Sequence, residues 1–380
     1  MNCARRPWCN LSPGLVSWGT PFPVPPVNQP AHVLVTHAGA FHSDEIMALV
    51  LLETFYLLRP LRMDLLSNDQ AHALIAEGKQ PDMPAMVRAD GLEDHRTPTW
   101  VIRSRTPELL QAAVASPTTF VVDVGGVYDT DALNFDHHQG SMTDAWEDGT
   151  PLSSTGLVWR WLKQRGLLTL SDAEQLELEE TLIRPLDAHD NGCAEFDAAT
   201  VCEGYNRLGS DVEVQVEQFQ KALTYLREVW ANHRFQAVAR AEARPVLTQA
   251  WEAARERGDR FVVLEDGLAY PDGTGLLKAI SNDEALMLAI PGKGKKISVI
   301  SLSGDTRFSV KCPLPEAWRG QMDFDAELDG GKTVRMAFAH KTGFMGVVLG
   351  ELGDAIAVCR HIEARYPHAW TPRRRGATLG

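Results

Sequence analysis

The chain has 380 residues, 44% of them hydrophobic, which is enough for two sizeable cores at roughly 100–200 residues per domain. Its net charge of −13 argues against a broad basic surface built for duplex DNA, although bound divalent cations can offset acidity locally. No apolar run is long enough to span a membrane. The six scattered cysteines contain no CxxC pair, so we expect reduced thiols in a cytoplasmic protein without a membrane partner.

The first elements are predicted from the N-terminus onward. Residues 1–31 are rich in Pro, Trp and Asn, contain no acid and lack helical periodicity, so we expect a disordered extension. An organelle-targeting peptide is the alternative interpretation, because Arg5 and Arg6 are basic. A short buried-type strand at residues 32–36 then leads through a Gly-containing loop into a helix from about residue 45 to 58.

The next segments alternate between strand and helix. Strands are predicted at residues 101–103 and 120–123, with a helix near 107–115 between them. The Ser/Thr cluster at 153–156 precedes another helix and is most simply its N-cap. This alternation indicates a mainly parallel sheet covered on both faces, with ligands bound beyond the carboxyl ends of its strands.

A long amphipathic stretch follows. Phe219, Leu223, Leu226 and Trp230 recur at helical spacing, which predicts a packed helix that runs to about Pro245 and bridges two domains. The second domain then carries strands and one final helix. They are expected at residues 261–264, 286–290, 297–300 and 336–338, and from about 347 to 365.

Four clusters of imidazole and carboxylate groups fall within about 155 positions, each where a predicted strand or helix meets a loop. They occupy residues 36–45, 121–126, 135–139 and 186–192. One such cluster would be weak evidence, because single residues of this kind also cap helices and end strands. Four in one α/β pattern indicate a polynuclear metal site, and mixed nitrogen and oxygen ligands suit Mn²⁺, Mg²⁺, Fe²⁺ or Zn²⁺.

The first three clusters supply most of the candidate ligands. His37, His42 and Asp44 can converge around one ion, because a short loop joins the strand that ends at His37 to the following helix. Asp123, at the end of a neighbouring strand, can bridge two ions, and His137 follows closely. Two ions about 3.5–4 Å apart would lower the pKa of a shared water and stabilise an in-line displacement at phosphorus.

Two roles remain open in the later clusters. Asp136 is placed to orient His137, and His138 could face the substrate phosphate. In the fourth cluster, either Asp187 or Asp190 is the ligand candidate, and both could merely cap a turn.

The motifs together carry a family resemblance. They read Thr-His-x-Gly-x-Phe-His-x-Asp-Glu from Thr36, Asp-Val-Gly-Gly-x-Tyr-Asp from Asp123 and Phe-Asp-His-His-Gln from Phe135. The set resembles the DHH phosphoesterase superfamily and, more narrowly, the MYG family (melanocyte proliferating gene, "metal-dependent protein hydrolase" in older naming). The similarity continues through residues 314–320 and 340–344, so it covers most of residues 32–360.

The resemblance implies an α/β fold, with an N-terminal mainly parallel-sheet DHH-type domain, a smaller C-terminal α/β domain and the active site in the cleft between them. We place a disordered extension at 1–31, the catalytic metal-binding domain at 32–210, a helical linker at 211–245, the substrate-binding domain at 246–370 and a tail at 371–380. Residues of about 60–99 look like an insertion, and Lys341-Thr342 replaces smaller residues expected before the Gly-Phe pair.

The resemblance also implies a ligand set and a cofactor. Two Mn²⁺ ions are expected, with Mg²⁺, Fe²⁺ or Zn²⁺ as alternatives. The metal ligands by similarity are His37, His42, Asp44, Asp123, His137 and Asp187, with Asp190 as an alternative ligand or a supporting group. His138 and Asp136 are the catalytic candidates, and the substrate-binding candidates are Arg319, His340, Lys341 and Gly343.

The predicted function is a metal-dependent phosphodiesterase, namely a 3′–5′ exonuclease acting on single-stranded RNA or short oligonucleotides. A small-phosphate hydrolase of the pyrophosphatase or cyclic-dinucleotide phosphodiesterase type is the first alternative, and a non-catalytic metal-stabilised binding protein is the second. Trp318 and Phe344, beside Arg319 and Lys341, offer faces for base stacking and favour nucleotides. The absence of an HExxH motif and of a clear nucleophile–base pair leaves protein hydrolysis without support.

Overall fold

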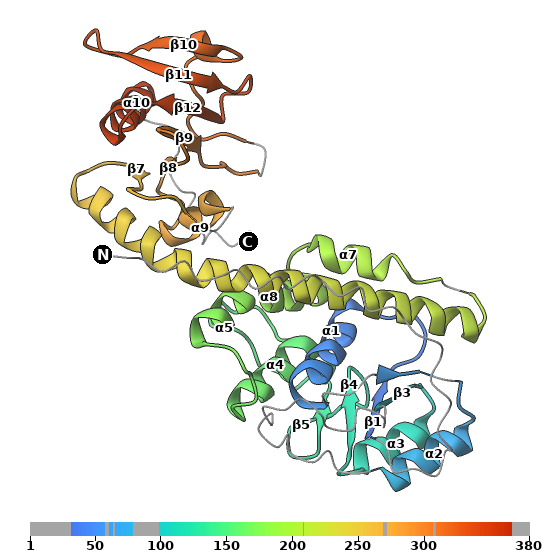
Figure 1. The fold of residues 1–380 in the computed structure, drawn as a ribbon. Helices are drawn as coiled ribbons and strands as arrows, with labels where there is room; N and C mark the ends of the chain where they lie inside the picture. The colour runs from blue at the N-terminus through green and yellow to red at the C-terminus, as the bar shows by residue number, and fades with distance from the viewer. Residues whose placement is uncertain are drawn as a thin grey trace, which may run out of the picture.

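The computed structural model describes residues 32–57, 61–63, 65–78, 99–207, 209–268, 272–306 and 309–366. These residues form two six-stranded sheets. Figure 1 shows the sheets lying apart, along opposite halves of the long helix α8 (Val212–Glu256) that joins them. The predicted α/β class is confirmed, with a mainly parallel N-terminal sheet and a second, mixed sheet.

The first sheet has the strand order β2-β3-β1-β4-β6-β5, and all neighbours are parallel except β5 and β6. Its strands are β1 (His32–Thr36), β2 (Leu61–Arg62), β3 (Thr99–Arg103), β4 (Thr119–Val122), β5 (Tyr128–Asp129) and β6 (Asn134–Phe135). The chain places β2 and β3 on one side of β1 and then crosses to the other side with β4. Crevices that hold ligands form beyond the carboxyl ends of strands at such a reversal.

Both faces of this sheet are covered by helices, as the parallel pattern predicts. Alternate side chains of β1 point to opposite faces: Leu34 packs in one core, whereas Val33 and Val35 pack in another. The first face is covered by α1 (Ser43–Leu52), its π-helical extension (Glu53–Leu57) and α4 (Ser154–Gln164). The second face is covered by α2 (Asn68–Glu77) and α3 (Pro107–Ala115).

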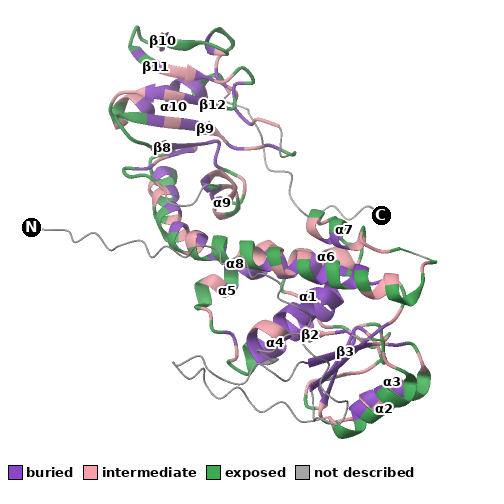
Figure 2. Ribbon diagram, turned by 45° about the vertical axis from the view of Figure 1, so that its right-hand side comes forward, coloured by how far each residue is buried: buried purple, intermediate pink, exposed green. Residues whose placement is uncertain are grey.

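Helix α1 is buried on every side, since all of its residues are inaccessible (Figure 2). It packs against α4 and α8 and also contacts two short helices, α6 (Arg184–Asp190) and α7 (Asp197–Glu203). Helix α6 continues from α5 (Asp172–Leu178) and a π-helical turn (Glu179–Ile183). The loop before α1 is therefore held within the N-terminal core, which gives its side chains fixed positions.

Helix α8 confirms the predicted apolar stripe, because Phe219, Leu223, Leu226 and Trp230 are all buried. The helix continues beyond Pro245 to Glu256, which corrects the expected end of the linker at residue 245. The continuation packs into the core of the second domain through Leu247 and Trp251. That apolar contact offsets the backbone hydrogen bond that a proline removes from a helix interior.

The second sheet has the order β10-β11-β12-β9-β8-β7 and is antiparallel except between β7 and β8. Its elements are β7 (Phe261–Val263), α9 (Gly273–Ile280), β8 (Met287–Pro291), β9 (Lys296–Ser301), a 3₁₀ turn (Glu316–Trp318), β10 (Met322–Glu327), β11 (Thr333–Ala339), β12 (Met345–Leu349) and α10 (Leu352–Arg365). The predicted final helix starts too early, because residues 345–349 pair with both β9 and β11. Val347 and Val348 are β-branched, which favours this strand.

Several predictions concern residues that the structure does not describe. The extension at 1–31 and the tail at 371–380 lie outside the described residues, as does most of the insertion at about 60–99. Within the described part of the chain, the cysteines are unpaired. No helix among the described residues is both long enough and apolar enough to cross a bilayer.

Candidate metal centre

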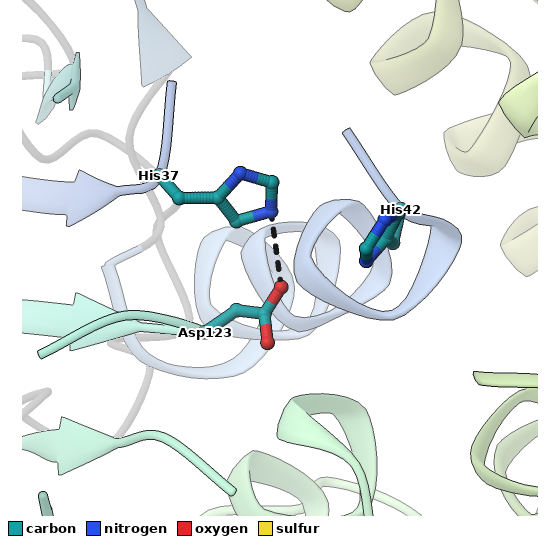
Figure 3. Close-up of side chains that lie close together, drawn as sticks. All are labelled: His37, His42 and Asp123. Atoms are coloured by element: carbon teal, nitrogen blue, oxygen red, sulfur yellow. Dashed lines mark ion pairs between the residues drawn. The ribbon is translucent and has the colours of Figure 1, made fainter. Parts of the chain in front are cut away.

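The predicted ligands gather at the carboxyl edge of the first sheet. His37 directly follows β1, Asp123 directly follows β4, and Asp136 and His137 directly follow β6. The three strands are neighbours in the sheet, and the first two flank the point where the chain reverses direction. His42 enters from the other side, as the residue that precedes α1 (Figure 3).

Asp123 lies between the two flanking histidines and presents one oxygen to each. Its Oδ2 is 3.2 Å from Nε2 of His37, and its Oδ1 is 3.2 Å from Nε2 of His137. Nε2 of His137 is also 3.3 Å from Oδ2 of Asp190 and 3.8 Å from Oδ2 of Asp44. A carboxylate that divides its oxygens in this way has the geometry of a bridging ligand.

Three overlapping groups in this cluster could each hold a metal ion, with all ligand atoms of a group within 4.8 Å of one another. They are His37 with His42 and Asp123, Asp123 with His137 and His138, and His42 with Asp44 and Asp190. Asp123 and His42 each belong to two groups. Such sharing is what a polynuclear centre requires, and the nitrogen and oxygen donors suit divalent transition metals.

The backbone at Asp123 is strained. Its φ angle is +60°, a conformation that non-glycine residues rarely adopt, and the side chain is buried. Strain of this kind costs about 1–3 kcal/mol and concentrates at functional sites. The backbone conformation here directs the carboxylate between His37 and His137.

Unsatisfied polar atoms show that the cluster fits a cation. Among the described residues, three buried atoms of the cluster make no well-formed hydrogen bond: Oδ1 of Asp44, and Oδ2 of Asp123 and Nε2 of His137, whose nearest charged neighbours lie 3.2 Å away. Burial of groups without partners is costly unless another ligand compensates. Divalent cations would supply partners for all three atoms at once.

The ionisation of the cluster agrees with this picture. Burial would lower the pKa of His37, but its contacts with Asp123 and Glu45 outweigh burial and raise the pKa to about 10. Burial, together with the charges of Asp123 and Asp190, raises the pKa of Asp44 well above its ordinary value. The histidines and acids of the cluster therefore retain protons when no cation is bound, and a bound cation would displace them.

The N-terminus of α4 donates hydrogen bonds to two acids of the cluster. The backbone N–H of Ser154 donates to Oδ2 of Asp44 at 3.1 Å, and its hydroxyl donates to Oδ1 of Asp123 at 3.3 Å. The expected N-cap position is confirmed at Ser153, but its side chain makes no capping bond. Its hydroxyl instead donates to Asp187, and the first turn of α4 is satisfied by carboxylates from other elements.

The two acids of the fourth sequence cluster have different positions. Asp190 joins the metal centre, 3.8 Å from Nδ1 of His42. Asp187 is fully buried and accepts bonds from Ser153, Gly156 and Trp146. The structure therefore places Asp190, rather than Asp187, among the possible ligands, and Asp187 fastens α6 to α4.

Asp136 and His138 form a pair of their own. Nδ1 of His138 lies 2.7 Å from Oδ1 of Asp136, and 57% of the His138 side chain is exposed. Asp136 also accepts from the backbone N–H groups of His138 and Gly126. Asp136 thus orients His138, and not His137 as the sequence suggested.

Glu45 was missed as a site residue. It lies within the first motif, where the sequence pattern predicts only the start of a helix. In the structure it is fully buried, 3.1 Å from Nε2 of His37, and accepts hydrogen bonds from Thr36 and from the backbone of His42. Glu45 therefore connects the two ends of the ligand loop, residues 37–42. Its position in the motif that also contains His37, His42 and Asp44 is the sequence signal for a role in the site.

Asn206, which lies just after α7, holds the same loop. Its amide group accepts from the backbone N–H of Phe41 at 2.9 Å and donates to the carbonyl of Phe41 at 2.8 Å. No motif marked this residue, because the contact joins positions 165 apart in the chain.

The predicted substrate-binding residues lie in the second domain: Arg319 follows the 3₁₀ turn, and the other three lie in the turn between β11 and β12, strands that Figure 1 shows standing away from α8 and from the first sheet. Nε of Arg319 donates to the carbonyl of Leu314 at 2.8 Å. Nδ1 of His340 is 2.9 Å from the hydroxyl of Thr342, and Lys341 is exposed. Gly343 has a φ angle of +78°, so it shapes the turn that presents these side chains. The structure brings these four residues together, but not with the metal centre.

Known proteins resemble this chain over most of its length. Residues 85–360 match the profile of the MYG1 exonuclease family, described as "Uncharacterised protein family (UPF0160)". The MYG1 protein of Schizosaccharomyces pombe is 27% identical over 345 residues, covering 82% of this chain and 92% of that protein. The MYG1 exonuclease of Homo sapiens is 24% identical over 360 residues, covering 82% of this chain and 80% of that protein.

Among solved structures, RecJ of Thermus thermophilus in complex with Mn²⁺ is similar, at 12% identity and a TM-score of 0.23, over 88% of this chain and 52% of that one. A TM-score this low does not support a structural inference. The family match spans more than half of the sequence, and it includes Asp123, the Asp-His-His motif and both acids of α6. The chain therefore belongs to the MYG1 family, UPF0160.

Proposed function

We propose that this protein is a metal-dependent phosphodiesterase, and specifically a 3′–5′ exonuclease that removes nucleotides from single-stranded RNA or short oligonucleotides. The observation that carries the proposal is Asp123, a strained and buried carboxylate shared by two candidate metal groups. Relatives in human and cattle are named MYG1 exonuclease, which supports a nucleic-acid substrate.

The chemistry follows from the arrangement of the side chains. When bound, a pair of divalent ions, which we propose to be Mn²⁺, would supply a polarised water and offset charge at phosphorus. His37, His42, Asp44, Asp123, His137 and Asp190 would hold the pair. The hydroxyl of Ser154, the first residue of α4, donates to Asp123 and so helps to hold this carboxylate in place within the cluster.

His138 is the proposed proton donor. Asp136 holds its Nδ1, so Nε2 is left for the substrate, and more than half of the side chain is accessible. A histidine oriented through one nitrogen by a carboxylate is a common arrangement for general acid–base catalysis. We assign it to protonation of the leaving oxygen.

The second domain is proposed to bind the rest of the substrate. Arg319, His340, Lys341 and Gly343 surround a turn that could contact phosphates if the substrate lies in a cleft between the two domains. The described cations Lys278 and Lys311 do not compete for this role, because both pair with Asp283 in addition to donating to backbone carbonyls. The net charge of −13 predicts weak, salt-sensitive binding of long polymers.

A release assay tests the proposal. The purified protein with Mn²⁺ would be offered short single-stranded RNA, short DNA, duplex RNA, a cyclic dinucleotide and pyrophosphate. We expect mononucleotide release from single-stranded RNA, little cleavage of duplex, and suppression by a blocked 3′ end. Asp123→Asn should abolish release, whereas Asp131→Asn should not, because the Asp131 side chain is 93% exposed and outside the cluster.

Other outcomes would change the assignment. Rapid hydrolysis of pyrophosphate or of the cyclic dinucleotide without mononucleotide release would favour a small-phosphate hydrolase. Metal binding without hydrolysis of any of these substrates would favour a metal-stabilised binding protein.

A further inference from the structure

An exposed arginine lies beside the candidate metal centre, just after the strand next to β1. Strand β3 ends at Arg103, and Arg105 follows just before α3. Since β3 and β1 are parallel neighbours, their carboxyl ends lie at the same edge of the sheet. The backbone N–H of Ser104 donates to the carbonyl of Thr36 at 2.9 Å, which continues the strand pairing and fixes Arg105 beside His37.

The two arginines of this segment differ in environment. Only 7% of the Arg103 side chain is exposed; it lies 3.8 Å from Glu45 and stacks over Phe219 and Phe41. These contacts explain Arg103 as a structural residue beneath the ligand loop. Arg105 is exposed and makes no ion pair with a carboxylate of the described residues, although the protein carries a net charge of −13.

The contacts of Arg105 hold its guanidinium at the edge of the cluster. Nε donates to the carbonyl of Ala38 at 2.7 Å, and Nη2 lies 3.2 Å from Nδ1 of His37. The opposite ring nitrogen of His37 faces Asp123. The guanidinium therefore contacts His37 on the side of the ring that faces away from Asp123.

We propose that Arg105 binds the substrate phosphate adjacent to the scissile one. The inference rests on the phosphodiesterase function proposed above and adds a positioning residue from the N-terminal domain. A guanidinium can form two parallel hydrogen bonds to a phosphate, and the bond to Ala38 restricts the orientation from which it does so. The scissile phosphate belongs at the metal ligands, so the next phosphate along the chain is the one that reaches Arg105.

The simplest structural role predicts something else. If Arg105 only fastens the ligand loop through Ala38 and His37, its removal should weaken metal binding and slow every substrate equally. A phosphate contact should leave metal binding unchanged and matter only for substrates that possess a second phosphate.

The test compares Arg105→Ala, Arg105→Lys and the wild type on a dinucleotide with one phosphate and a trinucleotide with two. Arg165→Ala is the matched control, because Arg165 is also a partly exposed arginine but caps the far end of α4. We expect Arg105→Ala to lose about tenfold or more in kcat/KM on the trinucleotide, mainly through KM, as for a lost charge-assisted bond. The dinucleotide rate and the metal content should stay at the wild-type level. Arg105→Lys should recover part of the loss, since it keeps the charge without the paired donors.

Binding of the trinucleotide to Ca²⁺-loaded protein separates this inference from the proposed function. If the wild type hydrolyses neither substrate, the function fails, and about tenfold weaker binding by Arg105→Ala would still support the phosphate contact. Equal losses on both substrates, a fall in metal affinity, or unchanged binding and kinetics in Arg105→Ala would each overturn the assignment of Arg105. Failure of the wild type to bind the trinucleotide would overturn both.

Discussion

Replacing Asp187 with alanine should destabilise the protein without emptying the metal centre. Oδ1 of Asp187 accepts from the N–H and hydroxyl of Ser153 at 3.2 and 2.6 Å and from the N–H of Gly156 at 2.9 Å. Its Oδ2 accepts from Nε1 of Trp146 at 2.7 Å. The substitution leaves two buried backbone N–H groups at the start of α4 without an acceptor, and it also frees the partly buried Nε1 of Trp146.

The magnitude follows from the number of donors that lose their acceptor. Each unsatisfied buried donor costs about 1–3 kcal/mol, and the hydroxyl of Ser153 can rotate to another acceptor. Loss of the acceptor for two buried backbone N–H groups and one partly buried indole N–H should therefore lower the free energy of unfolding by about 3–5 kcal/mol, with partial relief if water enters.

Asp190→Asn is the matched variant on the same helix. Asp190 is directed at His137 and His42 rather than at the backbone of α4. Asparagine keeps its size but removes the charge of a candidate metal ligand, so we expect a change below about 1 kcal/mol without metal. Added metal stabilises the wild type by RT ln(1 + [L]/Kd), about 2.7 kcal/mol at a hundredfold excess over Kd, and Asp190→Asn should lose most of this gain.

Urea denaturation with a chelator and with Mn²⁺ measures both quantities for each variant. Asp187→Ala should unfold more easily in both conditions while keeping its gain from Mn²⁺. The reasoning is refuted if Asp187→Ala keeps wild-type stability in chelator and loses the Mn²⁺ gain, while Asp190→Asn retains it. That result would make Asp187 the metal ligand.

Three further predictions concern contacts elsewhere in the fold. Asn206→Ala should weaken Mn²⁺ binding about tenfold in calorimetric titration, since it frees the backbone of Phe41 in the ligand loop; unchanged affinity would mean that the loop is held by other contacts. Gly343→Ala should lower the free energy of unfolding by about 1–3 kcal/mol in urea, because its φ angle is +78°, and wild-type stability would contradict the strained turn. Glu177→Gln should cost about 3 kcal/mol at neutral pH, because it breaks a buried pair with Arg244. Burial raises the pKa of Glu177, but Arg244 and its neighbour Arg240 outweigh burial and lower it below 4.5. The contribution of Glu177 to the free energy of unfolding is therefore present above about pH 4.5 and is lost as pH falls. Acid unfolding curves of the wild type and Glu177→Gln should converge at low pH. Parallel curves would exclude this ionisation.

The N-terminal sheet could be predicted because its signals are local. The strand at 32–36 and the helix at 107–115 coincide with β1 and α3. Apolar runs bounded by Gly, Pro and polar residues specify such elements without distant contacts. The placement of His37 and Asp123 at strand ends followed from the same patterns, together with the rule that parallel strands end at one edge.

Contacts between distant segments could not be predicted in the same way. Asp187 and Asp190 are three residues apart on one helix, and only the docking of α4 decides which of them faces the metal centre. The continuation of α8 beyond Pro245 depends on packing of Trp251 in the second domain, which overrides the local preference to end a helix. The pairing of Asp136 with His138 depends on a turn geometry that the Asp-His-His motif does not specify.

Two kinds of buried acid coexist in this protein, and the difference explains the assignment of the cluster. Glu177 is paired with two arginines and Asp187 accepts from four donors, so each is satisfied by the chain itself. Asp44 and Asp123 are equally buried, yet each retains an oxygen without a hydrogen bond among the described residues, and both oxygens belong to side chains of the same cluster. A cluster that served stability alone would be expected to satisfy its acids as the other two are satisfied. These oxygens therefore agree with the proposal that this edge of the sheet binds a cation.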